Sequence, residues 1–212
     1  MLLFPYLLFP LLMVLLIIIP FKFTINSLLT LIYTPLQLIK IASNRRLRKN
    51  HALEHATINV IEEYYGDQRL SGMAREDGFF ILGQLPPGLV EKAARVGLQR
   101  LKSGASELVV HKRCGTSLAM ANLVSALVFI FLLLNSGHFT FFYLVLALLA
   151  AHILGPVLGR IIQRHLTTST DLSDLFIAGA RTGHRQQNIF GFSFSRPDRI
   201  FIETYQQQGR AG

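Results

Sequence analysis

The sequence predicts an α-helical polytopic membrane protein that has three to four membrane helices and a small α+β unit on the cytoplasmic side. Hydrophobic residues make up 51% of the 212 residues, and charged residues make up only 16%. The apolar residues fall in long blocks on either side of a polar stretch, and a block of about 20 such residues can cross the hydrocarbon core. The chain has a net charge of +9. An excess of basic residues is typical of a membrane protein whose basic segments stay on the cytoplasmic side and face anionic lipid. The lipid bilayer is therefore an expected partner, and nucleic acid is not.

The first segment, residues 1–43, is expected to be embedded in the membrane. Residues 1–20 are almost wholly apolar and are predicted to span. A cleaved signal peptide is disfavoured, because no basic stretch precedes the run and no small-residue cleavage site follows it. Residues 24–42 are apolar but contain several polar residues, so they either return as the second arm of a hairpin or lie in the interface as an amphipathic helix. The basic residues at 44–49 predict that the C-terminal end of this first segment lies on the cytoplasmic side.

Residues 44–117 are predicted to form an α+β metal-binding unit outside the bilayer. Apolar residues at helical spacing indicate two helices, and short apolar runs around a Glu-Asp-Gly turn indicate a hairpin. A last short strand should deliver His111 to its end. The predicted elements are helix His51–Tyr65, strands Leu70–Met73 and Phe79–Leu82, helix Leu89–Lys102 and strand Glu107–His111.

The second half of the chain is predicted to hold a transmembrane helix pair and a basic tail. Residues 118–159 contain the apolar runs Leu118–Leu134 and Phe139–Leu158, joined by a short uncharged link. Residues 160–212 begin with basic residues, which return the chain to the side of the 44–117 unit. This tail is expected to pack on that unit and to contain strand-like runs at 190–194 and 200–205.

The motif that carries chemistry is His51-Ala52-Leu53-Glu54-His55. On a helix, His51 and His55 are one turn apart with Glu54 beside them, so the three side chains share one face. The order H-x-x-E-H is the inverted form of the zinc-hydrolase helix motif, in which two imidazoles hold the ion and the carboxylate activates its water. The alternative is an interfacial histidine pair that contacts lipid phosphates, with Glu54 making ordinary helix-face contacts.

A second cluster, His111-Lys112-Arg113-Cys114, lies about sixty residues downstream. Cys114 is the single cysteine, which excludes an intrachain disulfide, and His111 and Cys114 have a spacing that supplies one or two ligands from a turn. The predicted ligands of a zinc ion, or of another divalent transition metal, are therefore His51, His55, His111 and Cys114, with Asp171 and Asp174 as outer possibilities. Cys114 could instead be a small buried hydrophobe, which is a common fate of a free cysteine.

These motifs carry a resemblance to known families. The H-x-x-E-H motif followed by Ile58-Asn59, then His-x-Arg-Cys-Gly-Thr-Ser running into a membrane helix, resembles the bacterial YqhQ-type membrane proteins of uncharacterised function. The segment from Asn50 to Ser117 also resembles a cyanobacterial family of membrane proteins that carry His-Ala-Leu-Glu-His-Ala-Thr. The resemblance covers roughly residues 44–175 and implies a shared site built on His51, Glu54, His55, His111 and Cys114. It supplies no reaction.

Two functions are compatible with this site. In the first, four ligands close a Cys-His₃ zinc site, and the protein is an accessory or assembly subunit of a larger membrane protein complex. In the second, the chain is a membrane-embedded zinc hydrolase or peptidase of the inverted type, with Glu54 as the catalytic general base. Either protein would reside in a plasma or thylakoid membrane, with residues 44–117 and the C-terminus on the cytoplasmic side.

Overall fold

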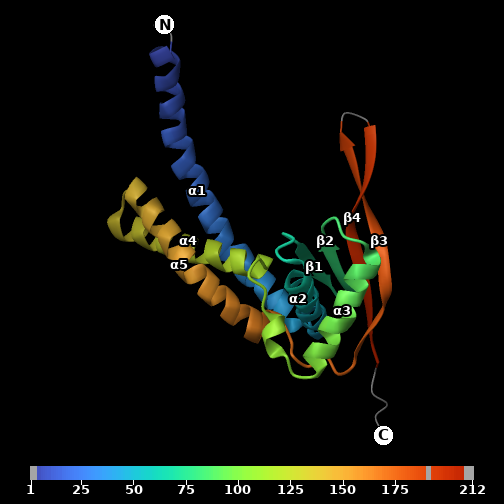
Figure 1. Ribbon diagram of the computed structural model, residues 1–212. Helices are drawn as coiled ribbons and strands as arrows, with labels where there is room; N and C mark the ends of the chain where they lie inside the picture. The colour runs from blue at the N-terminus through green and yellow to red at the C-terminus, as the bar shows by residue number, and fades with distance from the viewer. Residues whose placement is uncertain (1–3, 190–191, 208–212) are drawn as a thin grey trace. The chain divides into compact units, whose positions relative to one another are not determined.

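The computed structural model describes residues 4–189 and 192–207 and divides the chain into two compact units. The first unit comprises the chain up to Gln37 together with Leu118–Leu158, and the second comprises Leu38–Ser117 together with the chain from Gly159 onward. The first unit is helical, and the second contains the helices and the sheet that hold the predicted ligands (Figure 1).

The apolar helices are α1 (Phe4–Ser43), α4 (Gly115–Ser136) and α5 (Phe141–Ile162). Among the described residues, three helical segments are long and apolar enough to cross a membrane: Phe21–Ser43, Gly115–Ser136 and Phe141–Thr167. The prediction of a mostly helical chain with about three such segments and a small mixed unit is confirmed at this level. The predicted run Leu118–Leu134 falls within α4, and the run Phe139–Leu158 falls within α5 except for its first two residues.

The hairpin predicted as one alternative for residues 1–43 is wrong. Helix α1 continues without a break from Phe4 to Ser43, so the segment around Pro20 is not a turn (Figure 1). A proline removes one intrahelical hydrogen bond and bends a helix, but a long apolar helix tolerates it when its other backbone groups remain paired. Residues 24–42 therefore extend the first helix and do not return as a second arm.

Helices α4 and α5 approach each other closely through small residues. A Cβ placed on Gly155 would overlap Ala121, and a Cβ placed on Gly159 would overlap the Cα and Oγ of Ser117. Residues 155 and 159 form a Gly-x-x-x-Gly pattern, which lets two membrane helices pack backbone against backbone. The N-terminal turn of α4 and the last turns of α5 are thus held together next to Cys114.

After the last turns of α1, the second unit contains α2 (Arg45–Tyr65). The side chain of Asn44 accepts a hydrogen bond from the N–H of Leu47 and caps this helix. The chain then leaves the helix at Gly66, which has a φ of 72°. The remaining elements are strands β1 (Ser71–Arg75) and β2 (Gly78–Leu82), helix α3 (Pro87–Lys102), a 3₁₀ turn η1 (Ser106–Val109), a π-helical turn η2 (Gln163–Thr167), and strands β3 (Leu175–Ile189) and β4 (Phe192–Gln206).

The sheet is antiparallel with the order β1-β2-β4-β3, so the last strand lies in its interior (Figure 1). Phe79 pairs with Ile202 and Ile81 with Ile200, which places these four side chains on the buried face. Helices α2 and α3 cover that face. The buried core formed there includes Leu53, Ala56, Ile58, Ile61, Val90, Ala94, Leu101, Val109, Leu172 and Leu175.

The predicted strand Glu107–His111 is wrong, because this segment forms η1 and an extended stretch that pairs with no strand. Its backbone groups are bound by side chains instead. The Asn59 amide donates to the carbonyls of Leu108 and Val110, each at 3.0 Å, and His55 contacts the carbonyl of Val109. The backbone acceptors that a strand would pair in a sheet are therefore satisfied by helix α2.

The tail contributes two long strands to the unit. The run predicted at 200–205 lies in β4, where Ile200 and Ile202 are buried. The run predicted at 190–194 lies partly outside the described residues, and 192–194 belong to β4. Strand β3 was not predicted. Because β4 pairs directly with β2, the tail is part of the sheet of the second unit.

Candidate metal centre

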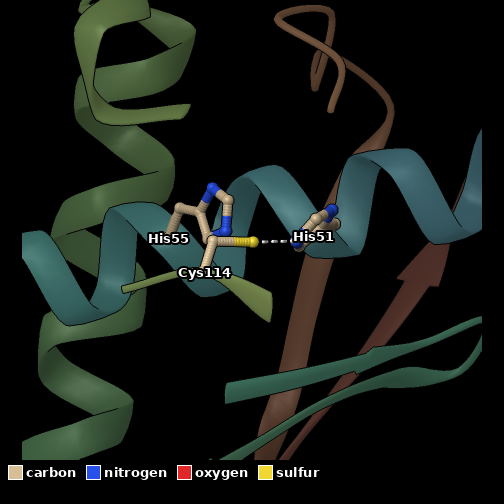
Figure 2. Close-up of side chains that lie close together, drawn as sticks. All are labelled: His51, His55 and Cys114. Atoms are coloured by element: carbon tan, nitrogen blue, oxygen red, sulfur yellow. Dashed lines mark hydrogen bonds between the residues drawn. The ribbon is translucent and has the colours of Figure 1, made fainter. Parts of the chain in front are cut away.

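Helix α2 presents His51 and His55 on one face, as their spacing predicts (Figure 2). Their ring centroids lie 4.3 Å apart. His55 is fully buried, and His51 is 7% exposed. Burial of two imidazoles side by side is costly unless each ring is hydrogen-bonded, so their polar contacts decide what the pair can do.

Cys114 completes the cluster from the turn that leads into α4 (Figure 2). Its Sγ lies 3.3 Å from Nε2 of His51, and one ligand atom from each of His51, His55 and Cys114 lies within 4.8 Å of the others. Around a tetrahedral zinc ion such atoms are about 3.3–3.7 Å apart, as Zn–N and Zn–S bond lengths require. The three side chains therefore need to close by only about 1 Å to share one ion.

The orientation of His55 is set by a backbone carbonyl. Nδ1 lies 2.6 Å from the oxygen of Val109, and a carbonyl oxygen only accepts, so Nδ1 carries the proton and donates. Nε2 then holds a lone pair. This atom is buried and has no hydrogen-bond partner among the described residues. A metal-ligating histidine is typically held in this way, with one ring nitrogen donating to a carbonyl and the other facing the ion.

His51 is held by the same kind of contact from another part of the chain. Its Nδ1 donates to the carbonyl of Thr167, at 3.0 Å, at the end of the π turn η2. Nε2 therefore has the lone pair, and it faces the Cys114 thiol. Two carbonyls from separate segments thus fix the same tautomer in both histidines. Both Nε2 atoms then point to the side of α2 on which Sγ of Cys114 lies.

The protonation states suit a cation. Burial lowers the pKa of His55 well below its usual value, and the neighbouring His51 lowers it further, so this ring stays neutral. Burial raises the pKa of the Cys114 thiol, although hydrogen bonds from Thr116 oppose this shift. The thiol is therefore protonated until a positive charge enters the site. An ion would find the neutral imidazole of His55 and a Cys114 thiol that releases its proton on binding.

Glu54 lies on the same helix and is 4% exposed. Burial raises its pKa to about 8, and the nearby Cys114 also raises it, while His51 and the backbone N–H of Ala74 lower it. Its carboxyl packs directly over Gly72 of β1, where a Cβ would overlap it. Glu54 therefore joins α2 to the edge strand and lies in the electrostatic field of the cluster, as a buried and largely protonated carboxyl.

His111 is not part of the cluster, although its ring centroid lies 6.1 Å from that of His55. Its Nε2 lies 3.4 Å from a carboxylate oxygen of Glu62, and Arg113 also binds Glu62 at 2.7 Å. The structure therefore brings together three of the four predicted ligands. The fourth is directed toward an ion-paired glutamate, because the segment before Cys114 follows α2 for two turns and places His111 beside Glu62.

Asp171 and Asp174, the outer possibilities, are engaged elsewhere. Asp171 accepts from Ser173 and from Arg45, whose Nη2 lies 2.9 Å away, and these contacts lower its pKa to about 2. Asp174 binds the ammonium of Lys49, a side chain that is fully buried. Both carboxylates form ion pairs with basic residues at the start of α2, and neither belongs to the cluster with the histidines.

Comparison with known proteins identifies the family of the chain and one relative. A domain of unknown function, DUF6391, matches residues 46–180. The chain belongs to the DUF6391 family. It is 30% identical over 141 residues to an uncharacterized protein of Picosynechococcus sp. (strain PCC 7002), an alignment that covers 60% of this chain and 68% of that protein. No solved structure matches it.

The family match confirms the expectation of a family of unknown function with a cyanobacterial relative. The resemblances to YqhQ-type proteins and to a family that carries the His-Ala-Leu-Glu-His-Ala-Thr motif stay predictions. The matched residues of this DUF6391 protein include all three side chains of the cluster and the π turn. The sequence does not indicate the groups that bind around the cluster, namely the carbonyls of Val109 and Thr167 on the two imidazoles and the side chain of Gln163 on His111 and Ser117. Carbonyls carry no sequence signal, and a single glutamine after an apolar helix carries little.

Proposed function

We propose that this DUF6391 protein is an integral membrane protein that binds a zinc ion through His51, His55 and Cys114. The observation that supports this most is Nε2 of His55, a buried lone pair without a hydrogen-bond partner in the described part of the chain. Such an atom costs about 1–3 kcal/mol when it stays unpaired. A cation between Nε2 and the thiol of Cys114 removes that cost.

The donor set favours zinc among the divalent metals. Two imidazoles and one thiolate are borderline-soft ligands, which suit zinc better than the hard cations that prefer oxygen. The side chains come from a helix and a turn, and tetrahedral coordination is compatible with ligands so arranged. Other divalent transition metals bind the same donors, so the choice of zinc is decided by measurement.

The proposed role of the ion is to fasten the second unit. Zinc would join helix α2 to the turn that carries Cys114 and continues into α4, a candidate membrane span. All three ligands are at most 8% exposed, which suits an ion that stabilises the fold. We infer that the protein is an accessory or assembly subunit of a larger membrane complex, in a plasma or thylakoid membrane, with the second unit facing the cytoplasm.

Ligand count supports a second candidate, a zinc hydrolase of the inverted type. With His111 directed to Glu62, three protein ligands remain, and three-ligand zinc sites leave a fourth position open. When bound, zinc would supply Lewis-acid activation of a water molecule. Glu54 lies beside His51 in the motif and in the field of the cluster. The charge of a bound ion would lower the pKa of this carboxyl, and once deprotonated it could act as the general base.

Metal analysis of the full-length protein, purified in detergent, tests the first proposal. We expect about one zinc ion per chain in the wild type and a large loss of zinc in His55→Ala and in Cys114→Ala. His138→Ala, which removes an exposed imidazole between α4 and α5, is the matched control and should retain the metal. Absence of metal from the wild type, or retention of metal by both ligand variants, contradicts the proposal.

Glu54→Gln separates the two candidates, because it removes the ability to accept a proton and keeps the shape of the side chain. If zinc stays bound, the fold is stable and function in the cell is lost, the hydrolase is supported. If function in the cell is retained while His55→Ala abolishes it, the structural role is supported. Co-purification of the wild-type chain with fixed partner subunits would support the accessory role further.

A further inference from the structure

Gln163 lies at the point where α5 ends and η2 begins, and it is fully buried. Its side chain uses both polar atoms. Oε1 accepts a hydrogen bond from the backbone N–H of His111 at 2.9 Å, and Nε2 donates to Oγ of Ser117 at 2.6 Å. His111 is on the segment that leads into α4 and Ser117 is in the first turn of α4, so both lie within three residues of Cys114.

The two hydrogen bonds of Gln163 enclose the turn that carries the thiol. His111 is three residues before Cys114 and Ser117 is three residues after it. Within this turn, the N–H of Cys114 donates to the carbonyl of His111 at 3.4 Å, and the N–H of Ser117 donates to the carbonyl of Cys114 at 3.0 Å. One side chain thus fixes both ends of the turn, and the position of Sγ depends on that turn.

Residues 163–168, which begin with Gln163, also contact the His51 side of the cluster. In the π turn η2, the N–H of Thr168 donates to the carbonyl of Gln163 at 3.0 Å. This geometry directs the Thr167 carbonyl to Nδ1 of His51, and Arg48 donates to the carbonyl of Thr168 at 2.8 and 3.1 Å. Insertions of π geometry into helices are frequent at functional sites, where they redirect backbone groups. Residues 163–168 therefore bind α2 through their carbonyls and the Cys114 turn through one side chain.

We propose that Gln163 is a positioning residue of the metal centre, which holds the Cys114 thiol in reach of the two imidazoles of α2. This inference rests on the proposed zinc site. Gln163 touches neither the ion nor a ligand atom, and it acts by fixing the turn of Cys114 against the segment that orients His51. Loss of an outer contact of this kind typically weakens metal binding about 10- to 100-fold.

Gln163→Met tests the proposal, because methionine has a similar length and cannot make either hydrogen bond. The full-length protein in detergent is stripped of metal, and its affinities for zinc and for cobalt(II) are measured by chelator competition. We expect the zinc Kd to rise about 10- to 100-fold and the sulfur-to-cobalt charge-transfer absorption, which reports the Cys114 bond, to weaken. Gln163→Glu keeps two acceptor oxygens for the His111 N–H and the Ser117 hydroxyl, so it should restore the absorption.

Asn50→Leu is the matched control. Asn50 is another buried amide of the same unit. It donates to the carbonyls of Arg75 and Glu76 and accepts from the hydroxyl of Thr204, and none of these partners belongs to the Cys114 turn. Thermal unfolding of each metal-free variant gives its loss of stability. At an equal loss of stability, Asn50→Leu should keep the wild-type cobalt spectrum.

A wild-type cobalt spectrum and zinc Kd in Gln163→Met would overturn the proposal, as would equal spectral changes in Asn50→Leu. If Gln163→Met does not fold, Ser117→Ala removes one of the two hydrogen bonds and should weaken the same absorption to a smaller extent. Failure of the wild type to bind either metal would instead overturn the zinc site itself, so the two failures are distinguishable.

Discussion

The carboxyl of Glu54 on α2 rests against the Cα of Gly72 on β1, with no space left for a Cβ between them. Strand β1 is the edge of the sheet, so this contact brings the motif helix against the outermost strand. Glycine at position 72 therefore permits the burial of Glu54. Any larger residue has to displace the carboxyl or the strand.

Gly72→Ala should accordingly destabilise the protein by about 1–3 kcal/mol, the usual cost of overpacking a buried contact. Thermal unfolding in detergent measures this as a lower Tm. Gly179→Ala is the matched control, since Gly179 is also in a strand and a Cβ added there would meet no other atom within 4 Å. Equal Tm values for Gly72→Ala and the wild type would show that the Glu54 contact is not retained in solution.

The stability of the metal-free protein should depend on pH through Glu54. Its pKa is about 8 in the folded protein and 4.5 in an unfolded chain, so the folded state binds more protons between these values. The contribution of Glu54 to the free energy of unfolding is therefore largest below pH 4.5 and is lost as the pH rises from about 4.5 to 8. Chemical unfolding at several pH values should show this fall, and Glu54→Gln should remove it.

His55 should give the opposite dependence at acid pH. Its pKa is lowered in the folded protein, so below the usual value of 6.5 the unfolded chain binds the extra proton and unfolding is favoured. We expect the metal-free wild type to lose stability as the pH falls below 6.5 and His55→Phe to lose less. If both proteins respond alike between pH 6.5 and 5, the ring of His55 is not held neutral by burial.

Zinc binding should release protons, because Cys114 enters the site as a thiol with a raised pKa and binds as a thiolate. Calorimetric titration in two buffers of different ionisation enthalpy gives the number released at pH 7, expected to be about one or more. The affinity should therefore increase with pH. Cys114→Ala removes the thiol proton, and proton release as large as that of the wild type would contradict the assignment of this ligand.

Asn59 provides a test of the segment that orients His55. Its amide donates to the carbonyls of Leu108 and Val110, on either side of the Val109 carbonyl that binds His55. Asn59→Leu leaves two acceptors without this donor and should cost about 1–3 kcal/mol of stability. Gln68→Leu, which removes one exposed amide contact to Tyr65, should change stability little. Urea unfolding curves of the two variants make the comparison.

The sequence indicates the helix of the centre well, because the four-residue spacing of His51 and His55 and the stop at Gly66 are local signals. Cys114 is predictable from its type and from the short distance to an apolar helix. His111 is not, since its direction depends on Glu62 and Arg113, which it meets only after the segment has packed on α2. Spacing alone therefore does not show that His111 lies apart from the cluster of His51, His55 and Cys114.

The wrong strand at 107–111 has a related cause. Its apolar residues fit a strand, but three carbonyls in it are taken by Asn59 and His55, about fifty residues earlier in the chain. Strand β3 has a polar sequence that does not indicate a strand, and it is formed by pairing along its length with β4. Gln163 was missed for the same reason, since nothing adjacent to it shows that it will be buried.

The interior position of β4 and the Thr167 carbonyl on His51 impose an order on how this protein matures. His51 is made 116 residues before the carbonyl that orients it, and β2 gains its second neighbour only when the last strand has been synthesised. Because synthesis proceeds from the N-terminus, helices α4 and α5 must both leave the ribosome before the histidines can be fixed. In the proposed zinc protein, metal loading is therefore a late event in biogenesis, and a chain stalled before residue 167 would carry His51, His55 and Cys114 without a formed centre.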